Sequence, residues 1–323
     1  MTRPRSELVC PAATPWYHCV CRCVRRAFLC GEDRLTGNDY SHRKAWVLER
    51  LALLSEIFTI DLGAYAVMAN HYHLVVRLDT ERAAALSDDD VIARWNRLFS
   101  LPLLVSRYQV GTLTTEAEIT AAKAIVNLWR QRLCDLSWYM RCLNEHLARL
   151  ANSEDGCKGR FWEGRYKSQA ILDEAGLLAC LVYVDLNPLR AAVVDVPEKS
   201  ADVSLHQRIQ PAPKEPEATL PALLPFVGGY QKPMPLGIPY DLIDYLQLTD
   251  WTGRAQCPNK RGHTDEQSPS ILSRLGMDGA SFLNAVARQR LSQGSVIGHP
   301  LACRQHAQQF QRRRLTSPLR AVA

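Results

Sequence analysis

The feature that most constrains the fold is a pair of strand-like runs separated by a very short turn. The runs TIDLGAYAVM and HYHLVVRLD, between Thr59 and Asp79, are rich in aliphatic, β-branched and aromatic residues. Only Ala69-Asn70 separates them, which is the length of a β-hairpin turn. Strands joined in this way pair antiparallel, so we expect an antiparallel sheet built around this hairpin.

Segments on both sides of the hairpin add to this sheet or cover it. Before it, Thr14–Phe28 alternates and is predicted to be a strand, and Ser41–Phe58 has the apolar spacing of an amphipathic helix. After it comes a predicted helical block from about Asp88 to Asn152, interrupted by a polar loop near residues 109–115.

The last part of the main domain is predicted to be one strand and one helix. RFWEGRYKSQAIL is typical of a strand, and the apolar helix after it is expected to stop near Asn187-Pro188 because proline lacks the amide hydrogen that a helix needs. The order β-α-β-β-helices-β-α predicts an α+β fold. We expect a ferredoxin-like antiparallel sheet with helices on one face and a helical insertion at about residues 80–150.

Proline marks a boundary in the chain, because eight prolines lie between residues 211 and 239. This composition is typical of a linker. We therefore predict a main domain over residues 1–210, a Pro-rich linker over residues 211–238 and a small basic helical module over residues 239–323.

Charge is unevenly distributed. From Trp251 onward the chain has 11 Lys and Arg against 3 Asp and Glu, whereas the first 250 residues have 28 against 30. This basic segment, which ends in QRRRLTSPLR, favours contact with nucleic-acid phosphates, and a solvated basic tail is the alternative.

Cysteine usage points to reduced thiols. The chain has 11 cysteines, an odd number, without a CxxC pair. Cys19, Cys21 and Cys23 alternate, so we expect them on one buried strand face rather than around a metal. Because we also identify no secretory signal or apolar run of membrane-spanning length, a cytoplasmic, nucleoid-associated protein without membrane contact is expected.

Two histidines lie two residues apart in the hairpin. On a strand His71 and His73 point to the same side and Tyr72 to the other, where we assign it to packing. Two imidazoles on one face are able to share a divalent ion, although they need an oxygen ligand from elsewhere to bind it well. The alternative is two polar residues on a solvated strand.

The helix before Pro188 offers what the histidines lack. Tyr183 and Asn187 are spaced i, i+4 and so lie on one helix face. A phenol is able to attack phosphorus when a metal polarises the phosphate, and an amide oxygen is an adequate third ligand. The alternative for Tyr183 is an ordinary half-buried tyrosine.

The motifs VMANHYHLVV, GRFWEGRYKSQAIL and CLVYVDLNPLRAAVV, in this order, resemble the HUH single-tyrosine transposases, and in particular the REP-associated tyrosine transposases. The resemblance covers roughly residues 10–200. It implies that His71, His73 and Asn187 hold Mg²⁺ or Mn²⁺ and that Tyr183 is the nucleophile. The segment Asp79–Asp135 is longer than in compact members of the family.

The resemblance also implies the reaction and the partner. The reaction is nicking and strand transfer of single-stranded, hairpin-forming repeat DNA through a 5′-phosphotyrosine link, without ATP. The protein is expected to act as a monomer or a homodimer. Basic side chains around the predicted strands and in the tail are candidates for DNA contact: Arg22, Arg25, Arg26, Arg165, Lys167, Arg312, Arg313 and Arg314.

Two other classes of function remain open. A non-catalytic regulator that binds DNA hairpins predicts metal-independent binding without cleavage. A zinc-stabilised interaction module predicts stoichiometric zinc in the purified protein.

Overall fold

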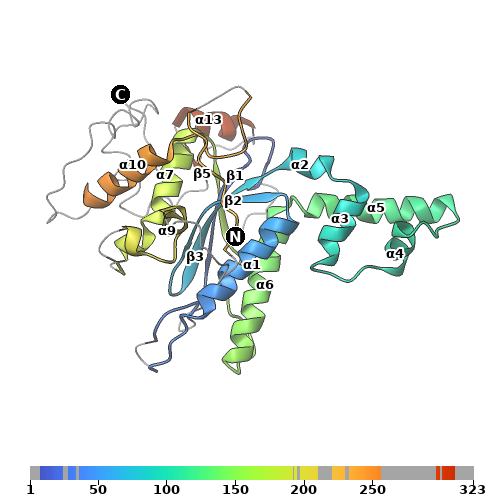
Figure 1. Ribbon diagram of the computed structural model, residues 1–323, viewed down its shortest axis with the longest axis horizontal. Coiled ribbons are helices and arrows are strands. Elements are labelled where there is room, and N and C mark those ends of the chain that lie inside the picture. The colour runs from blue at the N-terminus through green and yellow to red at the C-terminus, as the bar shows by residue number, and fades with distance from the viewer. Residues whose placement is uncertain are drawn as a thin grey trace.

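A five-stranded sheet of order β2-β3-β1-β4-β5 forms the centre of the molecule (Figure 1). The computed structural model describes residues 8–24, 28–33, 36–191, 193–194, 197–209, 220–229, 233–255, 296–298 and 300–309. The strands are β1 (Trp16–Arg22), β2 (Ile60–Val67), β3 (His71–Leu78), β4 (Lys167–Ile171) and β5 (Val296–Ile297).

The first four strands have the predicted antiparallel arrangement. β2 and β3 form the expected hairpin, β1 pairs with both β3 and β4, and β5 adds a parallel edge beside β4. The turn at Ala69-Asn70 is held by the amides of Leu29 and Cys23, which donate to the carbonyls of Ala69 and Asn70 at 2.8 and 2.9 Å. The α+β class is therefore confirmed.

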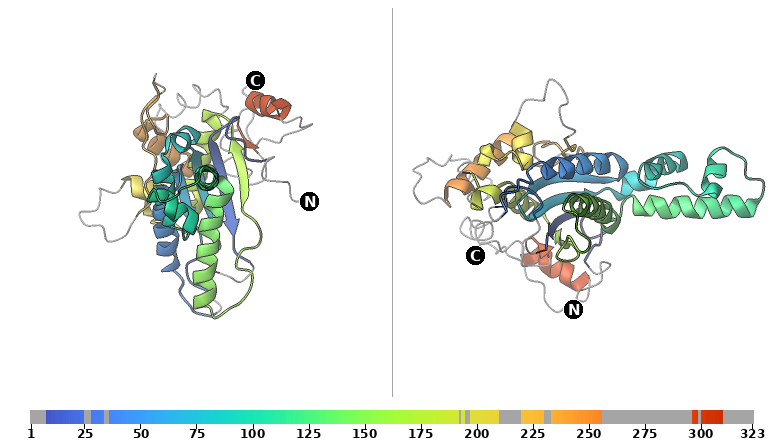
Figure 2. Two further views of the ribbon diagram at one scale, coloured as in Figure 1. Left: turned by 90° about the vertical axis from the view of Figure 1, so that its right-hand side faces the viewer. Right: turned by 90° about the horizontal axis from the view of Figure 1, so that it is seen from below.

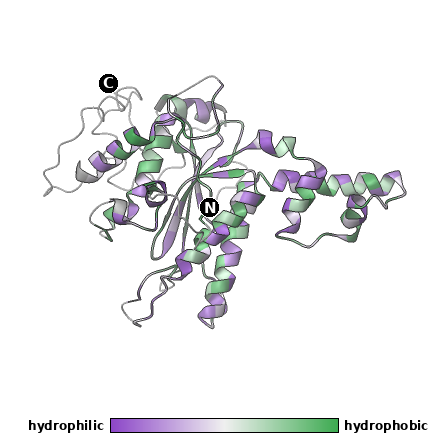
Figure 3. Cartoon of the chain, in the orientation of Figure 1, coloured by the Kyte–Doolittle hydropathy of each residue, from purple (hydrophilic) through white to green (hydrophobic). Residues whose placement is uncertain are grey.

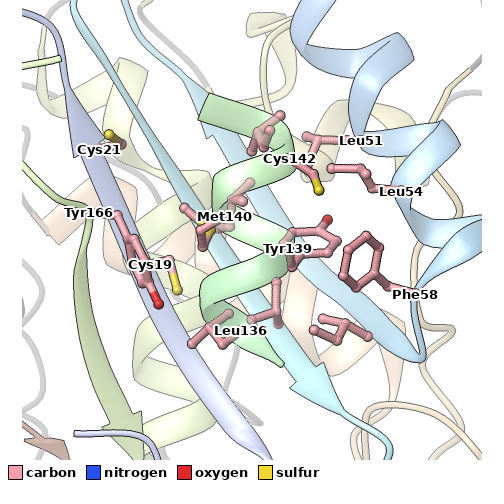
Figure 4. Close-up of a cluster of buried hydrophobic side chains, with 14 of the residues drawn as sticks. Cys19, Cys21, Leu51, Leu54, Phe58, Leu136, Tyr139, Met140, Cys142 and Tyr166 are labelled. Atoms are coloured by element: carbon pink, nitrogen blue, oxygen red, sulfur yellow. The ribbon is translucent and has the colours of Figure 1, made fainter. Parts of the chain in front are cut away.

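Two long helices cover one face of this sheet. They are α1 (Arg43–Ile57) and α6 (Leu136–Glu154), and both carry hydrophilic as well as hydrophobic residues (Figure 3). Their apolar sides meet cysteine side chains of β1, such as Cys19 and Cys21 (Figure 4). Cys19, Cys21 and Cys23 are buried on this face, as predicted.

The opposite face of the sheet is also covered, which corrects the expectation of helices on one face only. α7 (Glu174–Asp185) packs there with Ala64, Ala66 and Val75, and all its residues from Ala175 onward are buried. The reason is that β2 and β3 carry apolar side chains on both faces, and both must be removed from water. Neither α7 nor any other helix within the described ranges is both long and apolar enough to cross a membrane.

Only the first part of the predicted helical insertion, α2 to α5, extends away from the sheet (Figures 1 and 2). These inserted helices are α2 (Thr80–Ala85), α3 (Asp88–Asn96), α4 (Leu103–Gln109) and α5 (Glu116–Arg132). Trp95 and Trp129 stack at their centre with ring centroids 5.2 Å apart, and Phe99 lies 4.6 Å from Trp95. The last part of the predicted range forms α6, which packs on the sheet because its apolar side is buried there.

Described parts of the C-terminal third lie against the main domain. The buried Asp185 carboxylate accepts hydrogen bonds from Ser204 Oγ at 2.6 Å and from Tyr245 OH at 2.5 Å, which joins α7 to two later helices. The division into a main domain, a linker and a C-terminal module stays a prediction. The elements after α7 are α8 (Asn187–Arg190), the 3-10 helix Pro197–Lys199, α9 (Ser204–Ile209), α10 (Leu242–Ala255) and α13 (Pro300–Gln309).

The packing of α1 gives the first testable prediction. Leu54 is fully buried in the core between α1 and α6, so Leu54→Ala is expected to lower the free energy of unfolding by about 2–5 kcal/mol through lost burial and a cavity. Urea unfolding followed by circular dichroism measures this. The control is Glu49→Ala on the exposed side of the same helix, which should change stability by about 0.5 kcal/mol or less. Equal losses in both variants would contradict the described packing.

Candidate active site

The alternation of β3 separates its two histidines from the tyrosine between them. Tyr72 is buried on the α1–α6 side, where its hydroxyl donates to Asn144 Oδ1 at 2.6 Å. His71 and His73 lie on the α7 side with ring centroids 5.0 Å apart. The structure therefore brings the predicted histidine pair together and agrees with a packing role for Tyr72.

A third histidine, which the sequence analysis did not single out, joins this pair. His18 of β1 is fully buried, and its Nε2 lies 3.0 Å from Nδ1 of His73. Its other ring nitrogen, Nδ1, lies 2.8 Å from Oε1 of Gln169 on β4. A chain of side chains thus crosses three neighbouring strands, from Gln169 through His18 to His73.

α7 places Tyr183 against these imidazoles. The tyrosine ring meets His73 edge-on at a centroid distance of 5.5 Å and His18 at 5.9 Å. The helix starts at Asp173, whose side chain accepts from the Gly176 amide at 2.7 Å, as an N-cap does. Tyr183 therefore lies beside the histidines of its own chain.

The short helix α8, which follows α7, adds two more polar residues. Asn187 Nδ2 donates to the Tyr183 carbonyl at 3.1 Å, so the amide oxygen of Asn187 points away from that carbonyl. The guanidinium carbon of Arg190 lies 5.0 Å from the centre of the Tyr183 ring, which is a cation–π distance. Arg190, like His18 and Gln169, was not predicted.

Burial keeps the histidines neutral. It lowers the pKa of His18 to about 4 and that of His73 well below its usual value. It also lowers the pKa of His71 to about 4, with a smaller contribution from the nearby charge of Arg22. Near pH 7 all three imidazoles are therefore uncharged, and each has one nitrogen lone pair.

The residues present fit a divalent cation. His71 Nδ1 lies 2.7 Å from Asn70 Oδ1 and His73 Nδ1 lies 3.0 Å from His18 Nε2, so these contacts engage Nδ1 of each ring and not Nε2, the nitrogen that would bind a cation. In the described part of the chain, no group of three or more His, Cys, Asp or Glu side chains is arranged to hold a metal. The third ligand expected from the sequence is of another type, the amide oxygen of Asn187.

Two exposed cations lie at the edge of the site. Arg22 pairs with His71 in the β1–β3 register, and Lys167 pairs with Val20 in the β1–β4 register, so both are on the α7 face. Arg165 is exposed just before β4. Predicted DNA contacts that lie outside the described residues are Arg25, Arg26, Arg312, Arg313 and Arg314.

Strand alternation was the signal available for His18. In YHCVCRC the cysteines were assigned to one buried face, and the same period places His18, Val20 and Arg22 on the other. Gln169 had no comparable signal, because only the pairing of β4 with β1 brings it opposite His18.

Comparisons with known proteins give a distant likeness. No protein-family model matches the chain, and no curated protein matches it. Among solved structures, a REP-associated tyrosine transposase bound to a REP hairpin is similar over 64% of this chain and 84% of that chain. The sequence identity is 12% and the TM-score is 0.37. We therefore base the functional proposal on the side-chain geometry.

The neutral buried His18 predicts how stability depends on pH. Its pKa is about 4 in the folded chain and about 6.5 when unfolded, so the unfolded chain binds more protons as pH falls. His18 should therefore remove about 2 kcal/mol of unfolding free energy between pH 7 and pH 5. Urea unfolding at pH 7 and pH 5 measures this fall in unfolding free energy. The fall should be about 2 kcal/mol smaller in His18→Gln than in wild type, because glutamine does not titrate. An equal loss would show that His18 is not buried as described.

Proposed function

We propose that the protein is a metal-dependent single-strand DNA endonuclease and strand transferase that uses Tyr183 as its nucleophile. The observation that carries this proposal is the contact of the Tyr183 ring with His73, whose partner His71 lies on the same strand face. The proposed nucleophile and the two imidazoles proposed as metal ligands thus lie together on the α7 face of the sheet. Hairpin-forming repeat DNA is the proposed substrate.

The proposed reaction is a transesterification. The Tyr183 oxygen forms a bond to the phosphorus, the bond from phosphorus to the 3′ oxygen breaks, and the proton lost by the phenol is balanced by the one gained by the leaving 3′-OH. A 5′-phosphotyrosine link results, and a 3′-OH reverses the step to reseal a strand. Because bond energy is conserved in the link, ATP is not needed.

Side chains around Tyr183 are suited to bind the metal ion and the DNA phosphates for this step. His71 and His73, with Asn187, would hold Mg²⁺ or Mn²⁺, which supplies charge to polarise the phosphate when bound. Arg190 holds its positive charge over the Tyr183 ring, where it is suited to attract a phosphate. Arg22 and Lys167 are exposed at the same face and are suited to bind neighbouring phosphates.

One observation favours the second candidate function, a non-catalytic regulator that binds DNA hairpins. Tyr183 is only 3% exposed, so a phosphate has little access to this side chain unless its neighbours move. A regulator would not need this movement. The two functions differ in whether a covalent protein–DNA adduct forms.

The adduct is therefore the decisive test. Labelled hairpin oligonucleotide with a single-stranded flank, incubated with the full chain and Mn²⁺, should give a covalent adduct on a denaturing gel. Tyr183→Phe should abolish it, because phenylalanine has no oxygen to attack phosphorus. Tyr72→Phe is the matched control, since Tyr72 lies on the other sheet face. Binding without any adduct would support the regulator instead, and an adduct that survives Tyr183→Phe would refute the role of Tyr183.

The exposed cations give a separate prediction about DNA affinity. Arg22→Gln and Lys167→Gln should each weaken binding of the same hairpin and lower the slope of log affinity against log salt by about 1, because each removes one phosphate contact. Fluorescence anisotropy at salt concentrations between about 50 and 200 mM measures both the affinity and the slope. Arg149→Gln, an 83% exposed cation on α6 across the sheet, should leave the slope unchanged.

A further inference from the structure

We propose that His18 is a positioning residue for the histidine pair. Together with Gln169, it fixes the ring orientation and tautomer of His73 so that the Nε2 lone pair of His73 is available to a divalent cation. This inference deepens the proposed function and rests on it.

The direction of the hydrogen bonds from His73 through His18 to Gln169 follows from the last acceptor, the side-chain oxygen of Gln169. Gln169 Oε1 accepts only, so the His18 Nδ1 at 2.8 Å must carry a hydrogen. A neutral imidazole has one N–H, and therefore His18 Nε2 is an acceptor. His73 Nδ1, 3.0 Å away, must then donate to it. The Nε2 of His73 is left without a hydrogen, as metal ligation requires.

The relative position of the two rings supports a directed hydrogen bond rather than face-to-face stacking. The ring planes of His18 and His73 are within 5° of parallel, and their centroids are 5.2 Å apart. Such a long centroid separation with nitrogens only 3.0 Å apart is reached when the rings lie edge to edge in nearly one plane. The N–H of His73 then points at the lone pair of His18, which is the favoured geometry.

The pairing of β1 with β3 and β4 holds these three hydrogen-bonded side chains in place. His18 is opposite Gln169 in the β1–β4 register, and it is diagonal to His73 because His18 pairs with Val75 in the β1–β3 register. His18 is 0% exposed and His73 is 2% exposed, so water has no access to replace either partner. Loss of His18 should therefore leave His73 without its hydrogen-bond acceptor.

His71 provides an internal comparison. Its Nδ1 also has an acceptor, the side chain of Asn70 in the hairpin turn at 2.7 Å, but that contact is exposed. Water is able to take the place of Asn70, whereas nothing takes the place of His18. A change at Asn70 should therefore affect the histidine pair far less than a change at His18.

The tautomer is measurable directly in metal-free protein. In the ¹⁵N-labelled full chain at pH 7, long-range ¹H–¹⁵N correlation spectra should show His73 with a protonated Nδ1 and a bare Nε2. His73→Gln identifies the signals by their loss. A protonated Nε2 on His73 would mean that Gln169 donates and that the hydrogen bonds run in the opposite direction, which would overturn the proposal.

The affinity for Mn²⁺ tests whether the hydrogen bond from His73 to His18 supports metal binding. Titration of the full chain with Mn²⁺, followed by electron paramagnetic resonance of the free ion, should show about 10–100-fold weaker binding in His18→Leu. His18→Gln should restore most of the affinity, because its amide oxygen is able to accept from His73 while its nitrogen donates to Gln169. Asn70→Ala should change affinity by about 3-fold or less, since water replaces an exposed acceptor at small cost.

Two comparisons separate the positioning role of His18 from a loss of stability and from the nuclease function. Cys19→Ala, a buried change on the other face of β1, should leave Mn²⁺ affinity unchanged and so controls for loss of stability. Equal affinity in His18→Leu and wild type would refute the positioning role even if the DNA adduct forms. The expected tautomer and Mn²⁺ pattern without an adduct would support the positioning role while the proposed nuclease function fails.

Discussion

The register of β1 between β3 and β4 is the constraint on which the site depends. It places His18 opposite Gln169 and diagonal to His73, and it places Arg22 opposite His71. Side chains alternate along a strand, so a slip of one residue would turn His18 to the α1–α6 side and bring the cysteines to the α7 side. The hairpin turn is tied to the segment that follows β1 by backbone hydrogen bonds, which helps to fix this register.

Burial on the α7 face gives the histidines their chemical character. α7 removes water from the sheet surface and thereby makes protonation of His18 and His73 unfavourable, so the imidazoles remain neutral ligands and hydrogen-bond partners. The same helix carries Tyr183 on its buried side. Hydrophobic packing of one helix therefore controls both the protonation of the histidines and the position of the phenol.

Much of the fold could be predicted from periodicity. The β2–β3 hairpin and α1 follow from alternating or 3.6-residue patterns and a short connection, which are local properties. The second helical layer could not, because α7 is apolar around its whole circumference and its sequence does not indicate which face of the sheet it covers. Of the site, the side-chain direction of His71 and His73 was predictable. Tyr183 and Asn187 were expected on one helix, but α7 ends at Asp185 and Asn187 begins α8, although its side chain still contacts the Tyr183 carbonyl.

The sequence by itself determined which residue types share a strand or a helix face, because that depends only on the period of the element. Only the tertiary structure decided that β4 brings Gln169 to His18 and that α7 lies on the face of the histidines. These contacts join segments more than 50 residues apart in several cases, such as His18 with His73 and with Gln169. Strand pairing and helix docking set such contacts, and no local pattern encodes them.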